Sequence, residues 1–330
     1  MTQFRETLPF LILPFLACLT IAALHCYMGL HVLRRGVVFV DIALAQWAAL
    51  GAAVALWVSP YLMPAPEALP TPSSQTTLSN VTQELEGELQ SLVQQQTAAS
   101  STTSPPTPQP EPGHCHPSFR YGFSLGFALL GAVLLSLARF RERLVPHEAV
   151  IGILFVVAAA LSVLILSKTP HGHEKIETML IGSVLFVTPW QLIRMALLYL
   201  GIGILHFLLR RHFLLISQDV EAAERAGYRV YRWDILFFTT FALMVTESVA
   251  LAGVLVVFSY LIIPAACARL VVEGFGKQLL LAWGIALVVT LIGLLVSAFA
   301  DFPSGATIVT GFGIAFLLFG LYHKFCRSPR

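Results

Sequence analysis

Long apolar runs separated by short polar segments make up the pattern of this chain. A helix needs about 20 predominantly apolar residues to cross the hydrocarbon core of a membrane. Runs of this length recur along nearly the whole sequence, as continuous stretches rather than amphipathic stripes. The pattern predicts an all-α polytopic membrane protein with spans at 8–32, 37–58, 121–138, 148–167, 186–209, 233–250, 252–269, 278–299 and 304–324.

The number of spans depends on the run 233–269. This run is long enough for two tightly joined helices, with Gly253 as the turn between them. Two helices here give nine spans in all, which is the prediction, whereas one undivided helix gives eight.

Composition supports a membrane protein, since 57% of the residues are hydrophobic and only 12% are charged. A soluble domain carries about a quarter charged residues. The net charge of +2 says little about partners, because the placement of charges matters more than their sum. The five cysteines have no CxxC spacing, so they predict neither a disulfide framework nor a zinc ribbon.

The arginine and lysine residues of the short loops predict the orientation of the chain. With nine spans most of them fall on one side, which places the C-terminus in the cytoplasm and the N-terminus outside. With eight spans the N-terminus would lie inside. The residues that share this side are Arg34, Arg35, Arg139, Arg141, Arg143, Arg210, Arg211, Arg225, Arg229, Arg232, Arg269, Lys277, Lys324, Arg327 and Arg330.

Residues 59–119 contain no lysine or arginine and are rich in serine, threonine, glutamine and proline. This composition favours disorder. We expect a low-complexity external (periplasmic) loop between spans two and three of one transmembrane domain, 1–330. A short amphipathic helix is expected within the loop, where apolar residues recur at helical spacing from Leu78 to Leu92.

A polar segment at 214–232, containing ISQDVEAAERAGYRVYR, separates the fifth and sixth predicted spans. Asp219 is typical of a helix cap, and Gly227 is typical of a helix end. The segment therefore predicts a short cytoplasmic surface helix. A helix this polar between two spans must lie against water or another protein, so it is the expected docking site for a soluble partner.

The chain lacks the GxxxxGK[ST] loop that cradles nucleotide phosphates, and it lacks HExxH, GxSxG and dinucleotide-binding motifs. These absences leave a membrane protease or synthase without support but do not exclude one. If ATP drives its activity, the ATPase must be another chain.

Asp41 and Gln46 lie inside the second predicted span, in RRGVVFVDIALAQWAALGAAVALW. An ionisable residue in a membrane helix is costly and by default faces a partner, a cavity or a transported ion. Asp41 is accordingly interpreted as a carboxylate on a cation path, with a structural pairing to Arg34 or Arg35 as the alternative. Gln46 lies about 140° around the helix from the alignment that would put it on the same face as Asp41. It is therefore interpreted either as a ligand or as a group that hydrogen-bonds to a neighbouring helix.

Glu247 places a second carboxylate inside a span, in MVTESVALAG. From a different helix it could complete an oxygen-rich cation site, or it could lie solvated at an outer turn. Arg194, in the fifth span, is expected to neutralise a carboxylate such as Glu247. His25 and Cys26 are interpreted as buried packing residues, with a lining of the path as the alternative.

Four loop histidines are candidates for external metal capture. His171 and His173 lie at the outer mouth between two predicted spans, and His114 and His116 flank Cys115 near the end of the long loop. Imidazole and thiolate are good ligands for transition metals. His171 and His173 could receive a metal from a binding protein, with solvated loop histidines as the alternative, whereas His114 and His116 would form a low-affinity capture site at most.

Several motifs, in this order along the chain, resemble the permease subunits of zinc- and manganese-type ABC transporters. In the second span of that family, an Asp is followed by a small residue, Leu, Ser-His, and then small residues and Gly. The corresponding stretch of this chain runs from Asp41 to Gly51. The stretch AGVLVVFSYLIIPAACARL resembles the family segment with Gly253 and Pro264, and DFPSGATIV resembles the one with Pro303 and Gly305.

The polar segment adds to this resemblance. Glu221, Ala222 and the later Gly227 are similar to the EAA…G motif through which ABC permeases couple to their ATPases. One position departs from the family, because Gln46 stands where its members have histidine. An amide oxygen is a harder and weaker ligand than imidazole, so the identity of the metal is left open.

The resemblance implies a type II ABC-importer-like permease in a bacterial inner membrane, assembled as a homodimer. It implies a cytoplasmic ABC ATPase and an external solute-binding protein as partners, and no nucleic acid. The expectation for a transport subunit is that it is not itself an enzyme. The cargo would be a divalent transition metal, zinc or manganese first and iron next, with no permanently bound cofactor. The alternatives are an ABC permease for a metal chelate or siderophore-like cargo, a proton-coupled secondary transporter, and a non-transporting anchor that leaves the carboxylates unexplained.

Overall fold

The computed structural model describes residues 2–62, 117–138, 146–169, 182 and 184–326, and every regular element in these ranges is a helix. The expected all-α class is thereby confirmed. The helices are α1 (Thr2–Arg35), α2 (Val40–Leu62), α4 (Pro117–Ala138), α5 (His147–Leu166), the short 3-10 helix η2 (Val184–Phe186), α7 (Pro189–Leu208), α8 (Arg210–Gln218), α9 (Val220–Arg225), α10 (Val230–Ala252), α11 (Val254–Val271), α12 (Phe275–Ala300) and α13 (Ser304–Cys326).

Within the described ranges, nine helices are long and apolar enough to cross a membrane, one for each predicted span. Gly253 lies between α10 and α11 with φ of 79°. A residue with a side chain rarely adopts this backbone conformation, whereas glycine does so readily. The expected glycine turn therefore divides the run 233–269 into two helices, and the undivided alternative with eight spans is wrong.

Two compact units make up the chain, Met1–Trp57 with His116–Arg330 as one and Val58–Cys115 as the other. The second unit coincides closely with the predicted external loop. Only 58–62 of this unit are described, so the expected amphipathic helix lies outside the described residues.

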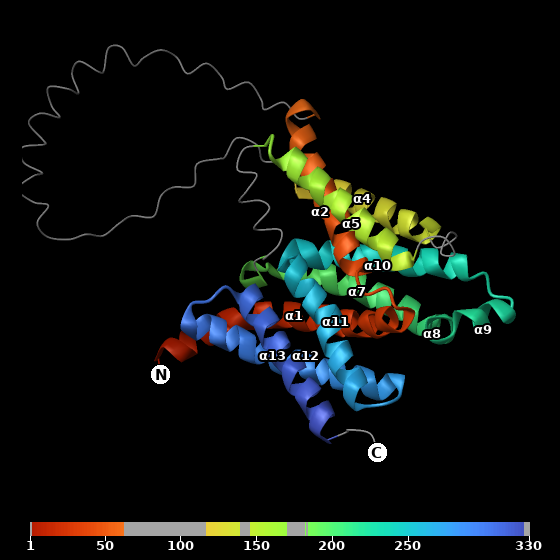
Figure 1. Cartoon of the computed structure of the whole chain (residues 1–330). Coiled ribbons are helices and arrows are strands. Elements are labelled where there is room, and N and C mark those ends of the chain that lie inside the picture. Colours follow the sequence, from red (N-terminus) through yellow and green to blue (C-terminus); the bar gives the residue numbers. More distant parts are fainter. Residues whose placement is uncertain (1, 63–116, 139–145, 170–181, 183, 327–330) are drawn as a thin grey trace, which may run out of the picture. The chain divides into compact units, whose positions relative to one another are not determined.

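The core of the first unit forms where α11 packs against α1, α12 and α13 (Figure 1). Helices in a membrane approach closely where small residues face the neighbouring backbone. Gly29 of α1 is such a residue, because a Cβ atom there would collide with the carbonyl oxygen of Leu261 in α11. Gly29 thus sets the spacing between two central helices.

Gly29→Leu is expected to lower the free energy of unfolding by about 1–3 kcal/mol or more, because the added side chain forces α1 away from α11. Thermal unfolding of the detergent-purified chain measures the effect. Gly201→Leu is the matched control, since Gly201 lies in α7 with nothing within 4 Å of the position of a Cβ atom. Equal losses in the two variants would contradict this account of the packing.

A second set of contacts holds α2 against α4 and α5. Gly51 lies against the backbone of Phe123, and the Ser124 hydroxyl donates a hydrogen bond of 2.8 Å to the Ala48 carbonyl oxygen. Trp47 packs with residues of α4 and α5. These contacts fix the helix that carries Asp41 in its first turn.

Candidate functional site

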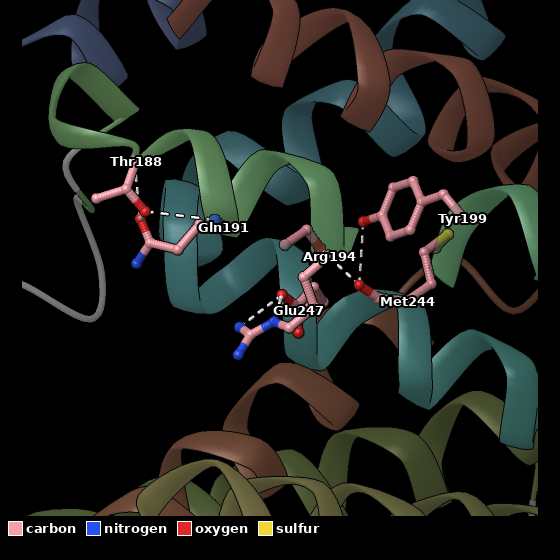
Figure 2. A network of polar contacts seen from close by, with 7 residues as sticks. Thr188, Gln191, Arg194, Tyr199, Met244 and Glu247 are labelled. Atoms are coloured by element: carbon pink, nitrogen blue, oxygen red, sulfur yellow. Dashed lines mark hydrogen bonds and ion pairs between the residues drawn. The ribbon is translucent and has the colours of Figure 1, made fainter. Parts of the chain in front are cut away.

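A capping box fixes the start of α7. The side chain of Thr188 accepts a hydrogen bond from the Gln191 backbone N–H, and the Gln191 Oε1 accepts one of 2.9 Å from the Thr188 backbone N–H. Pro189 follows at the first helical position, where its missing N–H costs nothing. This start sets the register of the helix and therefore the place of Arg194 one turn further on (Figure 2).

Arg194 of α7 forms an ion pair with Glu247 of α10. Its Nε and Nη2 atoms donate hydrogen bonds of 2.9 and 2.7 Å to Glu247 Oε1. The Glu247 side chain is 1% exposed, whereas that of Arg194 is 45% exposed. The pairing expected from the sequence is confirmed, and the alternative of a solvated Glu247 at an outer turn is wrong.

Two tyrosines surround this ion pair. The Arg194 guanidinium lies over the ring of Tyr121 from α4, 4.9 Å from its centroid, and Tyr121 also lies close to the Glu247 carboxylate. The Tyr199 hydroxyl donates a hydrogen bond of 3.1 Å to the Met244 carbonyl oxygen (Figure 2). Helices α4, α7 and α10 thus meet around one buried carboxylate.

His25 brings α1 to the same place. Its Nδ1 atom lies 2.9 Å from the Ile21 carbonyl oxygen, which can only accept, so Nδ1 carries the proton. The Nε2 atom faces the Ser248 hydroxyl at 3.3 Å, next to Glu247 in sequence. The His25 ring also lies 5.9 Å from that of Tyr199. The unprotonated Nε2 of His25 is therefore directed at Ser248, the residue that follows Glu247 on α10.

Asp41 is buried, with 1% exposure, in the first turn of α2. Its Oδ1 atom has no hydrogen-bond partner among the described residues. Asp41 and Glu247 both lie within electrostatic range of the Tyr199 hydroxyl. The sequence offers Arg34 and Arg35 as counter-ions for Asp41. In the structure Arg34 donates a hydrogen bond to Gln278, and Arg35 donates one to Ser217 and pairs with Asp234.

Gln46 is half-buried on α2, and within the described part of the chain it makes no hydrogen bond or ion pair with Asp41 or Glu247. Its role as a ligand stays a prediction. Among the residues with described positions, no three histidine, cysteine, aspartate or glutamate side chains are grouped closely enough to hold a metal ion. In this arrangement the counter-charge of Glu247 is an arginine.

The short helix predicted in the polar segment is present as α9. The Asp219 carboxylate caps it by accepting a hydrogen bond of 2.9 Å from the Ala222 N–H, and Gly227 follows it with φ of 82°. Gly227 is exposed, whereas Ala223 is buried. For Glu221 the structure describes the backbone alone. The segment therefore has the capped, partly exposed form that the sequence indicates.

A second polar network anchors α8 and α10 to α1. The Ser217 hydroxyl, at the end of α8, lies 2.9 Å from His31 Nδ1 and accepts a hydrogen bond of 2.9 Å from Arg35 Nε. Arg35 also pairs with Asp234 at 2.8 Å, with side-chain exposures of 2% and 0%. Helices α1 and α10 therefore contribute residues to this network and also to the surroundings of the ion pair between Arg194 and Glu247.

The remaining expected residues are placed as follows. Pro264 lies inside α11, Pro303 immediately precedes α13 and Gly305 is buried in its first turn. The four candidate capture residues lie outside the described residues, namely His114, His116, His171 and His173.

Sequence reasoning missed Tyr121, Tyr199 and Ser248 at the ion pair, and Ser217 with Asp234 at the second network. The tyrosines and Ser248 stand in apolar runs where nothing local distinguishes them from packing residues. Asp234 carried a usable signal, because it begins a predicted span that otherwise holds one carboxylate. That signal indicates a partner without identifying it.

Two relatives match a large part of the chain. The first is the "Chelated iron transport system membrane protein YfeC" of Yersinia pestis, 25% identical over 210 residues, which are 61% of this chain and 71% of the relative. The second is the "Manganese transport system membrane protein MntC" of Listeria innocua, 26% identical over 199 residues, which are 59% of this chain and 69% of the relative.

A solved structure titled "An inward-facing conformation of a putative metal-chelate type ABC transporter" is similar to the chain, with a TM-score of 0.62 and 16% identity, covering 94% of this chain and 85% of that one. This likeness shows the fold alone, and it confirms the expected permease fold. The family model described as "ABC 3 transport family" matches residues 120–323, well over half of the chain. The chain therefore belongs to the ABC 3 transport family.

Proposed function

We propose that the chain is the transmembrane subunit of an ATP-driven importer for a divalent transition metal, with zinc or manganese first and iron next. The family match over residues 120–323 supports the importer subunit. The names of the relatives, which concern manganese and chelated iron, support a metal as cargo.

The observation that carries the proposal is a pair of buried carboxylates on different helices. Asp41 lies on α2 with one oxygen free of partners among the described residues, and Glu247 lies on α10. A buried carboxylate in a membrane is costly unless it serves an ion path or a partner. Asp41 and Glu247 would supply oxygen ligands, with Gln46 and the Nε2 of His25 beside the path. The chain binds and releases the ion, and ATP hydrolysis belongs to another subunit.

The proposed assembly contains two copies of the chain in a bacterial inner membrane, with the C-terminus in the cytoplasm and the N-terminus outside. Two cytoplasmic ATPases bind α9 around Glu221, Ala222 and Gly227, and an external solute-binding protein delivers the ion. The capped and partly exposed form of α9 supports its docking role.

A chelate is the second candidate cargo, and Gln46 is the residue that favours it. An amide is a weaker ligand for transition metals than the imidazole expected at this position. Competition separates the two cargoes. Cells that depend on this chain are given labelled free zinc or manganese together with excess unlabelled ion or excess iron chelate. We expect free ions to compete and the chelate not to compete. Competition by the chelate alone would contradict the choice of cargo.

Gly227→Val is expected to reduce association with the ATPase several-fold without changing metal binding by the chain. A β-branched residue is strained by about 1–2 kcal/mol at φ of 82° and would distort the end of α9. Co-purification of the ATPase measures association. Gly274→Val is the matched control, because Gly274 is also exposed with φ of 90° and an open Cβ position. Equal loss of the ATPase in both variants would contradict docking at α9.

A further inference from the structure

The ion pair between Arg194 and Glu247 is asymmetric. Glu247 is 1% exposed and has no access to water that would stabilise its charge, whereas the Arg194 side chain is 45% exposed. Removing one partner of a buried ion pair is costly, because the remaining charge is left uncompensated. Glu247 therefore depends on a cation beside it, whereas the Arg194 side chain is only partly enclosed.

The hydrogen bonds of the pair are also incomplete. The Nε and Nη2 atoms of Arg194 both donate to the same oxygen, Glu247 Oε1. The Oε2 atom is buried and has no hydrogen-bond partner among the described residues. A guanidinium in a strong permanent pair commonly bonds both carboxylate oxygens in parallel. Glu247 thus has one buried carboxylate oxygen that Arg194 does not bond, with the Tyr121 hydroxyl close to the same carboxylate.

Tyr121 lies close to both members of the ion pair, since its hydroxyl also interacts with the Glu247 carboxylate. The guanidinium lies 4.9 Å from the centroid of the Tyr121 ring. A cation over an aromatic face is attracted to it without a fixed hydrogen-bond geometry. The contact with Tyr121 therefore stabilises the guanidinium independently of its hydrogen bonds to Glu247.

We propose that the Arg194 guanidinium and the transported cation bind the Glu247 carboxylate in turn. Arg194 pairs with Glu247 while the site holds no cargo, and it moves away when a divalent ion binds. This inference rests on the proposed function and adds a specificity-determining residue to it. Binding of the ion and pairing of Arg194 with Glu247 are then mutually exclusive.

Selection by charge follows from this exchange. An ion of charge +2 interacts with a carboxylate about twice as strongly as a monovalent ion at the same distance. A monovalent cation gains no charge advantage over the guanidinium that it must replace, so sodium and potassium ions leave the pair intact. Competition from Arg194 also weakens binding of the cargo, which favours its release.

Calorimetry on the purified full-length chain in nanodiscs tests the exchange, with manganese or zinc as the titrant. Arg194→Gln is expected to bind the ion about tenfold more tightly, because the competing charge-assisted hydrogen bonds are removed. Without metal, the same variant should unfold at a lower temperature than wild type. With metal added, the two unfolding temperatures should be equal. Arg211→Gln removes an exposed arginine of α8 and should match wild type.

A measurement on the wild-type chain is independent of any variant's ability to fold. An arginine-reactive dicarbonyl reagent is applied with and without manganese, and modification is followed by mass spectrometry. The metal should increase the rate at Arg194 several-fold and leave Arg211 unchanged. Unaltered reactivity of Arg194 together with unchanged affinity in Arg194→Gln would overturn the exchange while leaving metal transport intact. If wild type binds no divalent ion at all, the proposed function fails and the exchange fails with it.

Discussion

Asp41→Ala is expected to reduce metal uptake by about 100-fold or more while the chain still inserts into the membrane. The carboxylate is buried at the start of α2, and its Oδ1 atom has no hydrogen-bond partner among the described residues. Losing one charged ligand worth about 3 kcal/mol corresponds to a roughly 100-fold weaker site. Uptake of labelled manganese or zinc, normalised to the amount of chain in the membrane, measures the loss.

Two further variants sharpen this prediction. Asp41→Asn keeps the size of the side chain and removes only its charge, so it should lose uptake as Asp41→Ala does. Asp301→Asn is the control, because Asp301 is exposed at the end of α12 and its left-handed φ of 56° suits asparagine. Wild-type uptake by either Asp41 variant would show that the ion does not depend on this carboxylate.

Asp234→Ala is expected to produce the largest loss of stability, about 3–5 kcal/mol, because it leaves the buried Arg35 charge without its carboxylate. The two side chains are 2.8 Å apart, with exposures of 2% and 0%. Arg35 also lies 4.1 Å from the centroid of the Phe237 ring, so it is enclosed by α10. Thermal unfolding of the purified chain measures the effect.

A double substitution checks that the charge is the cause. Arg35→Met combined with Asp234→Leu removes both charges, and such replacements of buried pairs are often neutral. The double variant should therefore be more stable than Asp234→Ala alone. An Asp234→Ala chain that unfolds within one degree or so of wild type would mean that the ion pair contributes little to the fold.

The spans, the turn at Gly253 and the helix α9 could be predicted from the sequence because their signals are local. Apolar length defines a span, a glycine permits the φ of 79° between α10 and α11, and Asp219 and Gly227 mark the ends of α9. The pairing of Arg194 with Glu247 was also predictable. Two opposite charges within apolar spans have few other ways to be neutralised.

The surroundings of that ion pair could not be predicted, because they depend on which helices pack together. Tyr121 and Tyr199 come from α4 and α7, and His25 comes from α1, more than 200 residues from Ser248. The carboxylate of Asp234 follows an arginine-rich segment that the sequence places in water. The fold instead buries it against Arg35 of α1, a residue read from the sequence as a loop charge.

Reconstitution into proteoliposomes tests the central claim most directly, which is that the chain passes a divalent metal ion under the control of a separate ATPase. Labelled manganese or zinc is supplied with the binding protein, and accumulation is measured with the ATPase and ATP, without ATP, and with the chain alone. We predict accumulation only when ATPase and ATP are both present. Accumulation by the chain alone, driven by a proton gradient, would contradict the account and indicate a secondary transporter.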